Sequence, residues 1–277
     1  MPLSISTNVA SMAAQRSFFN SNIALETAFE RLATGQRVNS SVDDAAGMSI
    51  GKDLQSRVSG LNQAIRNVND GISMVQIAEG AMDEATNILH RMRDLAVQGA
   101  SDSLAATERG FLETESDKLI TAYNNVMSGT KWNGAVLFGT TQDESKVIQI
   151  GADDGDTLTV TFNDTSLSST GYNVTDARMQ FDSQANASDT ISFVDSALSA
   201  LATDRAQLGA TQTQLESTVR NLANVAENTA AAAGRIMDTD YAAETANLTK
   251  AQILQQAATS ILAQANAQPQ AVLSLLQ

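Results

Sequence analysis

The sequence predicts a mainly α-helical chain, a long antiparallel coiled-coil or helical rod that carries a small β-rich segment. Three observations predict this class. Apolar residues recur at alternating steps of three and four over long stretches, and leucine recurs every seven residues late in the chain. The two prolines, Pro2 and Pro269, leave the interior without obligatory helix breakers.

The first element that we expect is an amphipathic helix over residues 3–32, with Gly35 as its C-terminal stop. Large apolar side chains form its stripe, which makes it a candidate contact surface. The stripe comprises Ile5, Val9, Met12, Phe19 and Ile23. Beyond the helix, Ser41 and Asp44 resemble a capping box that opens the next helix.

The second expected helix is the longest. Its apolar stripe extends from Leu54 to Leu95, which corresponds to roughly 60 Å at about 1.5 Å per residue. A compact domain does not need a helix of this length, whereas a rod does. A further helix is expected at about 104–128, and it supplies another apolar stripe to the same rod.

A short β-rich segment is expected at about 131–190. Asn133-Gly134 is a strong turn signal. Residues 147–150 and 158–162 are rich in the β-branched and apolar side chains that are typical of strands. The acidic stretch between these strands lacks the spacing of a calcium-binding EF-hand loop, so we interpret it as a hairpin turn.

Helical patterning resumes near Ile191 with the seven-residue leucine repeat. The repeat comprises Leu201, Leu208, Leu215 and Leu222. A DNA-binding zipper needs a basic helix upstream, but residues 176–200 contain one arginine and several aspartates. We therefore expect an intramolecular seam.

The last expected helix spans about 241–276. Its stripe provides further candidate contact residues, which are Leu254, Ala258, Ile261, Val272 and Leu275. A terminal helix of this kind cannot bury such a stripe on its own and needs a partner to cover it. The pattern at both ends therefore predicts assembly.

The composition argues against several functional classes. The formal net charge is -14, which disfavours nucleic-acid partners because their phosphates are bound by Lys and Arg. The chain has no cysteine, which removes disulfides and thiolate metal sites. The sequence contains no run of 18 apolar residues, so we expect no transmembrane helix. The N-terminus lacks the pattern of a general secretory signal peptide.

No catalytic, cofactor-binding or metal-binding constellation is expected. His90 is the only histidine, and its place beside two arginines is typical of a solvated helix residue. A hydrolase would have to recruit this side chain for a Ser-His-Asp arrangement. No phosphate-binding glycine motif occurs either, so we expect no enzyme, no cofactor and no metal.

Both ends of the chain resemble bacterial flagellin. The N-terminal motifs include Glu30-Arg31-Leu32-Ala33-Thr34-Gly35, Asp43-Asp44-Ala45-Ala46-Gly47-Met48 and Asp70-Gly71-Ile72-Ser73. The C-terminal motifs include Leu208-Gly209-Ala210, Arg235-Ile236-Met237-Asp238-Thr239-Asp240-Tyr241 and Pro269-Gln270-Ala271-Val272-Leu273. The resemblance covers about 1–163 and 191–277, with the motifs in matching order.

The resemblance implies a discontinuous two-layer flagellin architecture. Residues 1–42 and 236–277 would form the inner, channel-lining domain of terminal helices. Residues 43–235 would form the helical rod domain with its β-rich segment. The variable outer domains of larger members are expected to be absent, because little sequence separates that segment from the helix near Ile191.

The resemblance also implies a function. The chain would be the structural subunit of the extracellular flagellar filament, a homopolymer for motility that assembles through its terminal helices. Type III export of the unfolded chain would explain the missing signal peptide. The implied partners are the flagellar export chaperone, the filament cap and the hook-junction proteins. The alternative is a hook-filament junction protein, a relative that forms a short adaptor.

One helix face has a second implied role. From spacing alone, Arg91, Leu95 and Gln98 belong to a helix surface with one packing contact. With Glu115 on the neighbouring helix, they match the region that the animal Toll-like receptor for flagellin recognises in many family members. The resemblance therefore implies innate immune recognition at these four residues.

Overall fold

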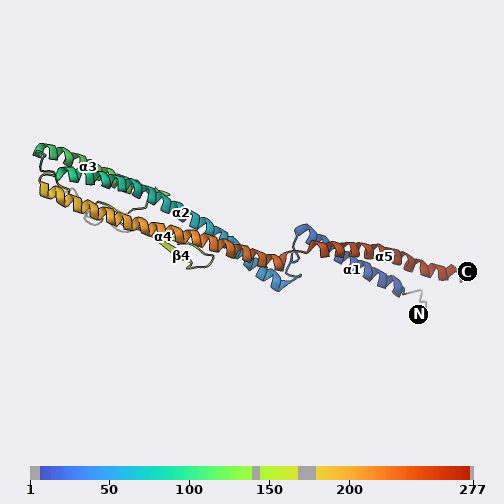
Figure 1. Cartoon of the computed structure of the whole chain (residues 1–277). Helices are drawn as coiled ribbons and strands as arrows, with labels where there is room; N and C mark the ends of the chain where they lie inside the picture. Colours follow the sequence, from blue (N-terminus) through green and yellow to red (C-terminus); the bar gives the residue numbers. More distant parts are fainter. Residues whose placement is uncertain (1–6, 139–143, 168–178, 275–277) are drawn as a thin grey trace. The chain divides into compact units, whose positions relative to one another are not determined.

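The computed structural model describes residues 7–138, 144–167 and 179–274, with side chains as far as Ala267 in the last helix. Helices dominate, which confirms the predicted mainly α class (Figure 1). The elements are α1 (Val9–Thr34), α2 (Ala45–Gly99), α3 (Ala106–Gly129), β1 (Lys131–Trp132), β2 (Ala135–Val136), β3 (Glu144–Gln149), β4 (Thr157–Phe162), α4 (Gln184–Met237) and α5 (Tyr241–Ser274).

The chain forms two compact units. The terminal unit comprises Met1–Val58 and Glu227–Gln277, and the central unit comprises Ser59–Ala226. The terminal unit is therefore built from both ends of the sequence, as the discontinuous architecture requires. Among the described helices, none combines the length and apolarity needed to cross a membrane.

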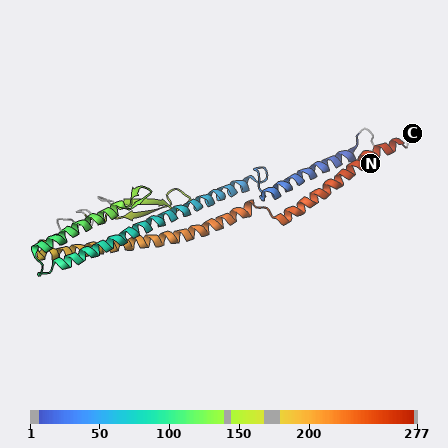
Figure 2. The same cartoon turned by 90° about the horizontal axis from the view of Figure 1, so that it is seen from above.

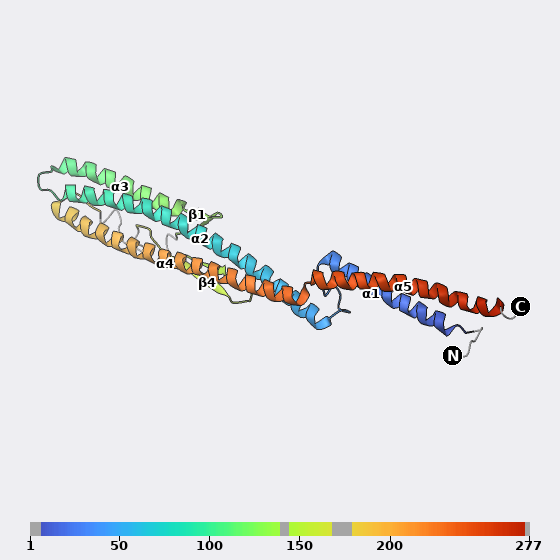
Figure 3. The same cartoon turned by 45° about the vertical axis from the view of Figure 1, so that its right-hand side comes forward.

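In the central unit, parts of α2 and α4 lie side by side with α3 (Figure 3). The seven-residue repeat of α4, from Leu201 to Leu222, is buried in their common core. Val68, Val75 and Met82 of α2 are buried in the same core at steps of seven. The intramolecular seam predicted for the leucine repeat is confirmed, because all of these side chains pack within one chain.

Two antiparallel hairpins make up the described β structure. β1 and β2 are joined by Asn133 (φ 48°) and Gly134 (φ 81°), the positive φ values that a tight hairpin turn requires. β3 pairs with β4 from Glu144↔Phe162 to Gln149↔Thr157. The turn signal and both longer strands were therefore predicted correctly.

The chain leaving β4 is tied to the helices by buried polar contacts. The Tyr123 hydroxyl on α3 donates to the Thr165 carbonyl at 2.9 Å, and Asn163 donates to Asp204 of α4. Burial raises the pKa of Tyr123 well above its usual value, with smaller contributions from the Asp204 and Asp164 carboxylates. Tyr123 thus stays protonated and keeps its hydroxyl as a donor.

The helix boundaries at the N-terminal end have clear local causes. Gly35 ends α1 as predicted, with φ 71° and an N–H that donates to the Arg31 carbonyl at 2.9 Å. The start of α2 differs from the expected capping box. Asp44 itself caps α2 by accepting from the Gly47 N–H at 2.8 Å, because α2 begins one turn later than a box opened by Ser41 would place it.

Candidate functional site

The terminal helices α1 and α5 pair with each other within the terminal unit, and both views place them side by side (Figures 1 and 2). The Asn8 amide donates to the Ala265 carbonyl at 2.7 Å, and Gln255 donates to the Asn22 side chain at 2.6 Å. The start of α1 thus meets the end of α5, so the pair is antiparallel. This is the pairing of the two ends that the resemblance implied.

Small side chains fill the seam between α1 and α5. They recur every seven residues and are buried, together with one carboxylate at the end of the seam. The seam residues are Ala14, Ser21 and Ala28 of α1, and Glu244, Ala251, Ala258 and Ala265 of α5. Small side chains allow the two backbones to approach closely, while larger apolar residues such as Phe18, Leu25 and Leu248 are partly buried.

Several large apolar residues of both helices face outward, with between 48% and 68% of each side chain exposed. We call them the outward apolar residues. They are Val9, Met12, Phe19, Ile23 and Phe29 of α1, and Ile253, Leu254 and Ile261 of α5. Folded monomers rarely expose large apolar residues in such number on one element pair, so these residues mark a surface that a partner covers.

The residues predicted for assembly therefore occupy different places. Six of them are outward apolar residues, whereas Ala258 lies in the seam. Ile5 and Leu275 lie outside the described residues, and the side chain of Val272 is also not among those described. Sequence reasoning missed Phe29, which is 50% exposed, and Ile253, which is 60% exposed. The position of Ile253 beside Leu254 in an otherwise polar stretch could have identified it.

The two breaks between the helices are hydrogen-bonded to each other. The Arg37 N–H donates to the Met237 carbonyl at 2.6 Å, and the Thr239 N–H donates to the Gly35 carbonyl at 3.0 Å. The Arg37 guanidinium also donates to the Ile236 carbonyl at 2.7 Å. The last carbonyls of a helix lack partners within it, so the N-terminal loop caps the C-terminal end of α4.

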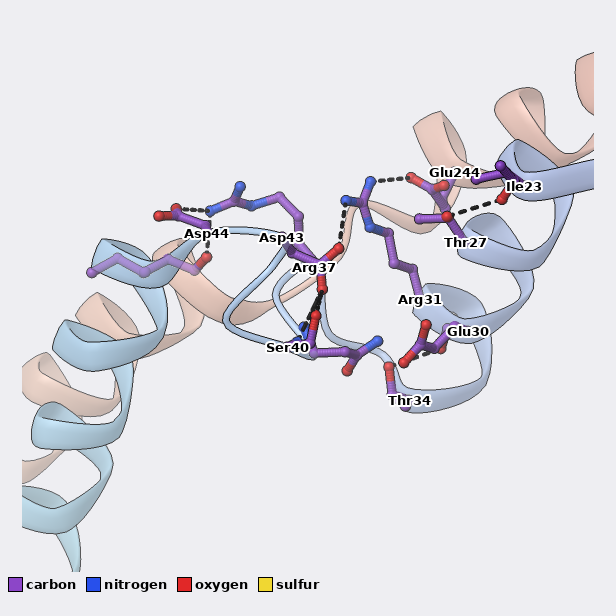
Figure 4. Close-up of polar contacts among 12 residues, drawn as sticks. Ile23, Thr27, Glu30, Arg31, Thr34, Arg37, Ser40, Asp43, Asp44 and Glu244 are labelled. Atoms are coloured by element: carbon purple, nitrogen blue, oxygen red, sulfur yellow. Dashed lines mark hydrogen bonds and ion pairs between the residues drawn. The ribbon is translucent and has the colours of Figure 1, made fainter. Parts of the chain in front are cut away.

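Charged side chains fix the same region. Arg31 on α1 lies between Asp43, at 3.8 Å, and Glu244 of α5, at 3.9 Å. Hydrogen bonds from the Ser40 N–H and then the Ser40 hydroxyl hold the pKa of Asp43 below its ordinary value, with smaller contributions from the Asn39 N–H and Arg31. One guanidinium thus links the end of α1, the following loop and the start of α5 (Figure 4).

The residues implied in receptor recognition lie on the central unit. Arg91 of α2 and Glu115 of α3 form an exposed ion pair with two N–H···O contacts of 3.0 and 2.6 Å. Gln98 is also exposed. Leu95 is only 1% exposed and packs in a small core cluster with residues such as Phe181. It therefore supports this surface from below.

The structure also places the lone histidine. His90 is an exposed residue of α2. Over the described part of the chain, no three or more His, Cys, Asp or Glu side chains gather in a way that could hold a metal ion.

Two family models match the sequence. The bacterial flagellin N-terminal helical region matches residues 5–143. The bacterial flagellin C-terminal helical region matches residues 191–276. The two matched ranges contain the outward apolar residues of α1 and of α5, respectively.

Similar proteins are matched over nearly their full length. The flagellin of Halalkalibacterium halodurans is 38% identical over 273 residues, which is 99% of each chain. Flagellin B of Vibrio cholerae is 33% identical over an alignment of 376 residues that covers both chains completely. The longer alignment means that this relative carries additional residues between shared ends.

Solved structures agree with these matches. Bacillus cereus flagellin is 29% identical with a TM-score of 0.50, covering 61% of this chain and 94% of that one. The fold is shared with a putative flagellar hook-associated protein from Vibrio parahaemolyticus. That protein is 16% identical with a TM-score of 0.60, covering 71% of this chain and 100% of that one. With both terminal regions matched and relatives aligned from end to end, the chain belongs to the bacterial flagellin family.

Proposed function

We propose that this chain is the structural subunit of an extracellular bacterial flagellar filament, in which neighbouring copies cover the outward apolar residues of α1 and α5. One observation carries the proposal. Apart from Glu244, the buried residues between the two helices are small, while eight large apolar side chains of the same helices stay about half exposed or more. A partner is therefore needed for these residues, and in a homopolymer that partner is another copy.

Burial of the outward apolar residues favours assembly. Covering a half-exposed Val, Leu, Ile, Met or Phe side chain stabilises a contact by about 1 kcal/mol. The outward apolar residues together thus supply several kcal/mol per subunit. This gain recurs at every subunit of a polymer, so a long filament can be stable although one isolated contact is weak.

Charge does not oppose this packing. α1 carries two acidic and two basic residues, and α5 carries one of each. The net charge of -14 consequently resides in the rest of the chain. Copies that meet through their terminal helices avoid most of the like-charge repulsion that such a chain would otherwise experience.

We also propose a domain division. Residues 1–42 and 236–277 form the terminal-helix domain, and residues 43–235 form the rod domain. The helix breaks at 35–44 and 238–240 support this division. They separate the α1–α5 pair, which carries the outward apolar residues, from the longer helices α2 and α4. Each of these longer helices has residues in both compact units.

Delivery of the subunit requires the apolar residues to be kept apart from other copies. We propose type III export of the unfolded chain, with the export chaperone covering α5 and the filament cap and hook-junction proteins as further partners. The absence of cysteine supports this route, because an unfolded chain with no thiols cannot be trapped by disulfides. These partners follow from the resemblance to flagellins.

The first test compares two substitutions at Phe19, which is 63% exposed. Phe19→Gln removes apolar area from the outward surface, whereas Phe19→Leu keeps most of it. Both residues are compatible with a helix. We expect Phe19→Gln to raise the critical concentration for seeded polymerisation at least tenfold, and Phe19→Leu to raise it less than threefold, as measured by sedimentation and electron microscopy.

Circular dichroism of each monomer is the control, since unchanged helix content shows that α1 still forms. Equal polymerisation of both variants would contradict the assignment of assembly to this face. The unmodified chain could instead form only a short layer on the filament seeds that never elongates. That outcome would favour the hook-filament junction alternative.

A second candidate function is recognition by the animal Toll-like receptor for flagellin, proposed for the surface of Arg91, Gln98 and Glu115 with Leu95 beneath it. The exposed Arg91–Glu115 pair supports it, because it joins two helices into one charged surface. Arg93 provides a matched control, since it pairs with Asp195 of α4 in the same manner at 2.6 Å.

We expect Arg91→Ala to reduce activation of a receptor reporter by monomeric protein at least tenfold. Arg93→Ala should leave it within about twofold, because surface ion pairs of this kind contribute about 0–1 kcal/mol to folding in either case. Equal losses in the two variants would instead indicate a general effect on the helices.

A further inference from the structure

The sulfur atoms of this chain are distributed unevenly. There is no cysteine and there are nine methionines. Among the methionines that the structure describes, Met12 alone is exposed, at 56%, and Met48 is half-buried. The remaining described methionines are at most 4% exposed; they are Met74, Met82, Met92, Met127, Met179 and Met237.

Met12 is also one of the outward apolar residues. It is exposed on α1 together with Val9 and Phe19, whereas the buried seam residue Ala14 marks the side that faces α5. Met12 therefore has two properties at once. Its thioether is open to solvent in the free subunit, and it belongs to the surface that the proposed function covers in the polymer.

An exposed thioether reacts with two-electron oxidants such as hydrogen peroxide. A lone pair of the Met12 sulfur attacks one peroxide oxygen, the O–O bond breaks and an S–O bond forms. The sulfur is oxidised to the sulfoxide, and the peroxide is reduced to water with transfer of a proton to the departing oxygen. A flexible apolar side chain thereby becomes polar and strongly hydrated.

We propose that Met12 is an oxidation site that controls whether a subunit can assemble. Oxidation by a peroxide in the free subunit excludes that subunit from the polymer, and incorporation into the polymer protects Met12 from oxidation. This inference rests on the proposed function, since it requires the outward apolar residues to be covered by another copy. A buried sulfoxide without a hydrogen-bond partner weakens such a contact.

The fold of the subunit is left intact by this reaction. The end of the helix pair nearest to Met12 is held by the Ser11 hydroxyl, which donates to the Asn266 side chain at 2.7 Å, and by the bond from Asn8 to Ala265. None of these groups is a thioether. The sulfoxide therefore changes the outer surface of α1 and keeps its pairing with α5.

The test uses the full-length chain and hydrogen peroxide, with removal of the oxidant by catalase before assembly. Peptide mass spectrometry measures the oxidised fraction at each methionine. We expect Met12 to oxidise at least tenfold faster than the six buried methionines. The oxidised monomer should show unchanged helix content and at least a tenfold higher critical concentration, equivalent to about 1.4 kcal/mol per subunit.

Three variants make the result specific to Met12. Met12→Leu conserves volume and cannot be oxidised, so peroxide treatment should leave the critical concentration of this variant at the value that it has before treatment. Met12→Gln should mimic the sulfoxide without any oxidant. Met48→Leu should remain as sensitive to peroxide as the original chain. Loss of assembly by peroxide-treated Met12→Leu, or normal assembly of the Met12 sulfoxide, would overturn the inference.

A protection experiment separates this inference from the proposed function. In preformed polymer, Met12 should oxidise at least tenfold more slowly than in monomer, and equal rates would overturn the inference. If Phe19→Gln assembles normally, the proposed role of the outward apolar residues in assembly is wrong, whatever the result at Met12. If Phe19→Gln fails to assemble while oxidised Met12 has no effect, the proposed function stands and the oxidation site is wrong.

Discussion

At the scale of single residues, Asp43 has a larger role than its exposed position suggests. Its carboxylate accepts from the Ser40 N–H at 2.9 Å and from the Ser40 hydroxyl at 3.0 Å, and it faces Arg31. These donors favour the charged carboxylate, which is why the pKa of Asp43 is held below its ordinary value. The charge of Asp43 therefore helps to hold the loop between α1 and α2 in place.

This arrangement predicts a pH dependence of stability. A carboxyl group with a lowered pKa in the folded state contributes stability at pH values above its ordinary pKa, about 3.9. The contribution is lost as the pH falls through the lowered value. We expect Asp43→Asn to lower the melting temperature of the chain at pH 7 and to have progressively less effect below about pH 4.

Thermal unfolding at a series of pH values measures this difference. Ser40→Ala removes one of the donors to Asp43 and should give a smaller effect with the same pH trend. A difference between Asp43→Asn and the original chain that stays constant from pH 7 to pH 3 would contradict this role of the charge.

At the scale of elements, the position of the β3–β4 hairpin depends on Gly71 of α2. A Cβ atom at Gly71 would overlap the Cδ1 atom of Ile148, which is buried on β3, and would also touch Leu215 of α4. The hairpin can pack closely on α2 because this helix position has no side chain. Gly80, on the same helix, has open space around it.

The two glycines give a matched pair of substitutions. We expect Gly71→Leu to destabilise the chain by about 1–3 kcal/mol, because the extra side chain overpacks the contact with the hairpin. Gly80→Leu should stabilise it by up to about 1 kcal/mol, because leucine favours a helix more than glycine does. Urea unfolding of both variants measures the difference, and equal stability would refute the contact at Ile148.

The helices of the central unit could be predicted well from sequence, whereas the terminal pair could be predicted only in part. In α4, large leucines recur every seven residues and are buried, so apolar size and burial coincide. In α5, the buried face is made of alanines such as Ala251 and Ala265, while Leu254 and Ile261 face outward. Hydrophobic pattern alone identifies the larger side chains first, because alanine contributes little contrast.

The same reasoning applies to the burial of Leu95, which is 1% exposed. Its spacing with Arg91 places both on adjacent parts of one helix face, but spacing does not say how far α3 covers that face. The packing of Leu112 of α3 and Phe181 on Leu95 depends on contacts between distant segments. Element positions were therefore predictable, and the depth of burial within a face was not.

At the scale of the whole molecule, the two units make different demands on the sequence. The central unit has its own core of helices and hairpins. The terminal unit needs both ends of the chain, since α1 and α5 cover each other. Loss of either end therefore removes one helix and leaves the small-residue seam of the other uncovered.

We expect removal of about 40 residues from either end to abolish polymerisation while the central unit stays folded. Circular dichroism and cooperative thermal unfolding test the folded rod, and electron microscopy after seeding tests polymerisation. A truncated chain that still forms long, uniform filaments would overturn the assignment of assembly to the paired termini.

The pairing of the two ends also sets the timing of folding. The bond from Asn8 to Ala265 joins groups that are 257 residues apart, and the bond from Arg37 to Ile236 spans 199 residues. Contacts between such distant positions form only after a large loop has closed. The α1–α5 pair therefore needs the complete chain, so an incomplete product of synthesis that lacks α5 never acquires the paired surface and cannot block the growing end of a polymer.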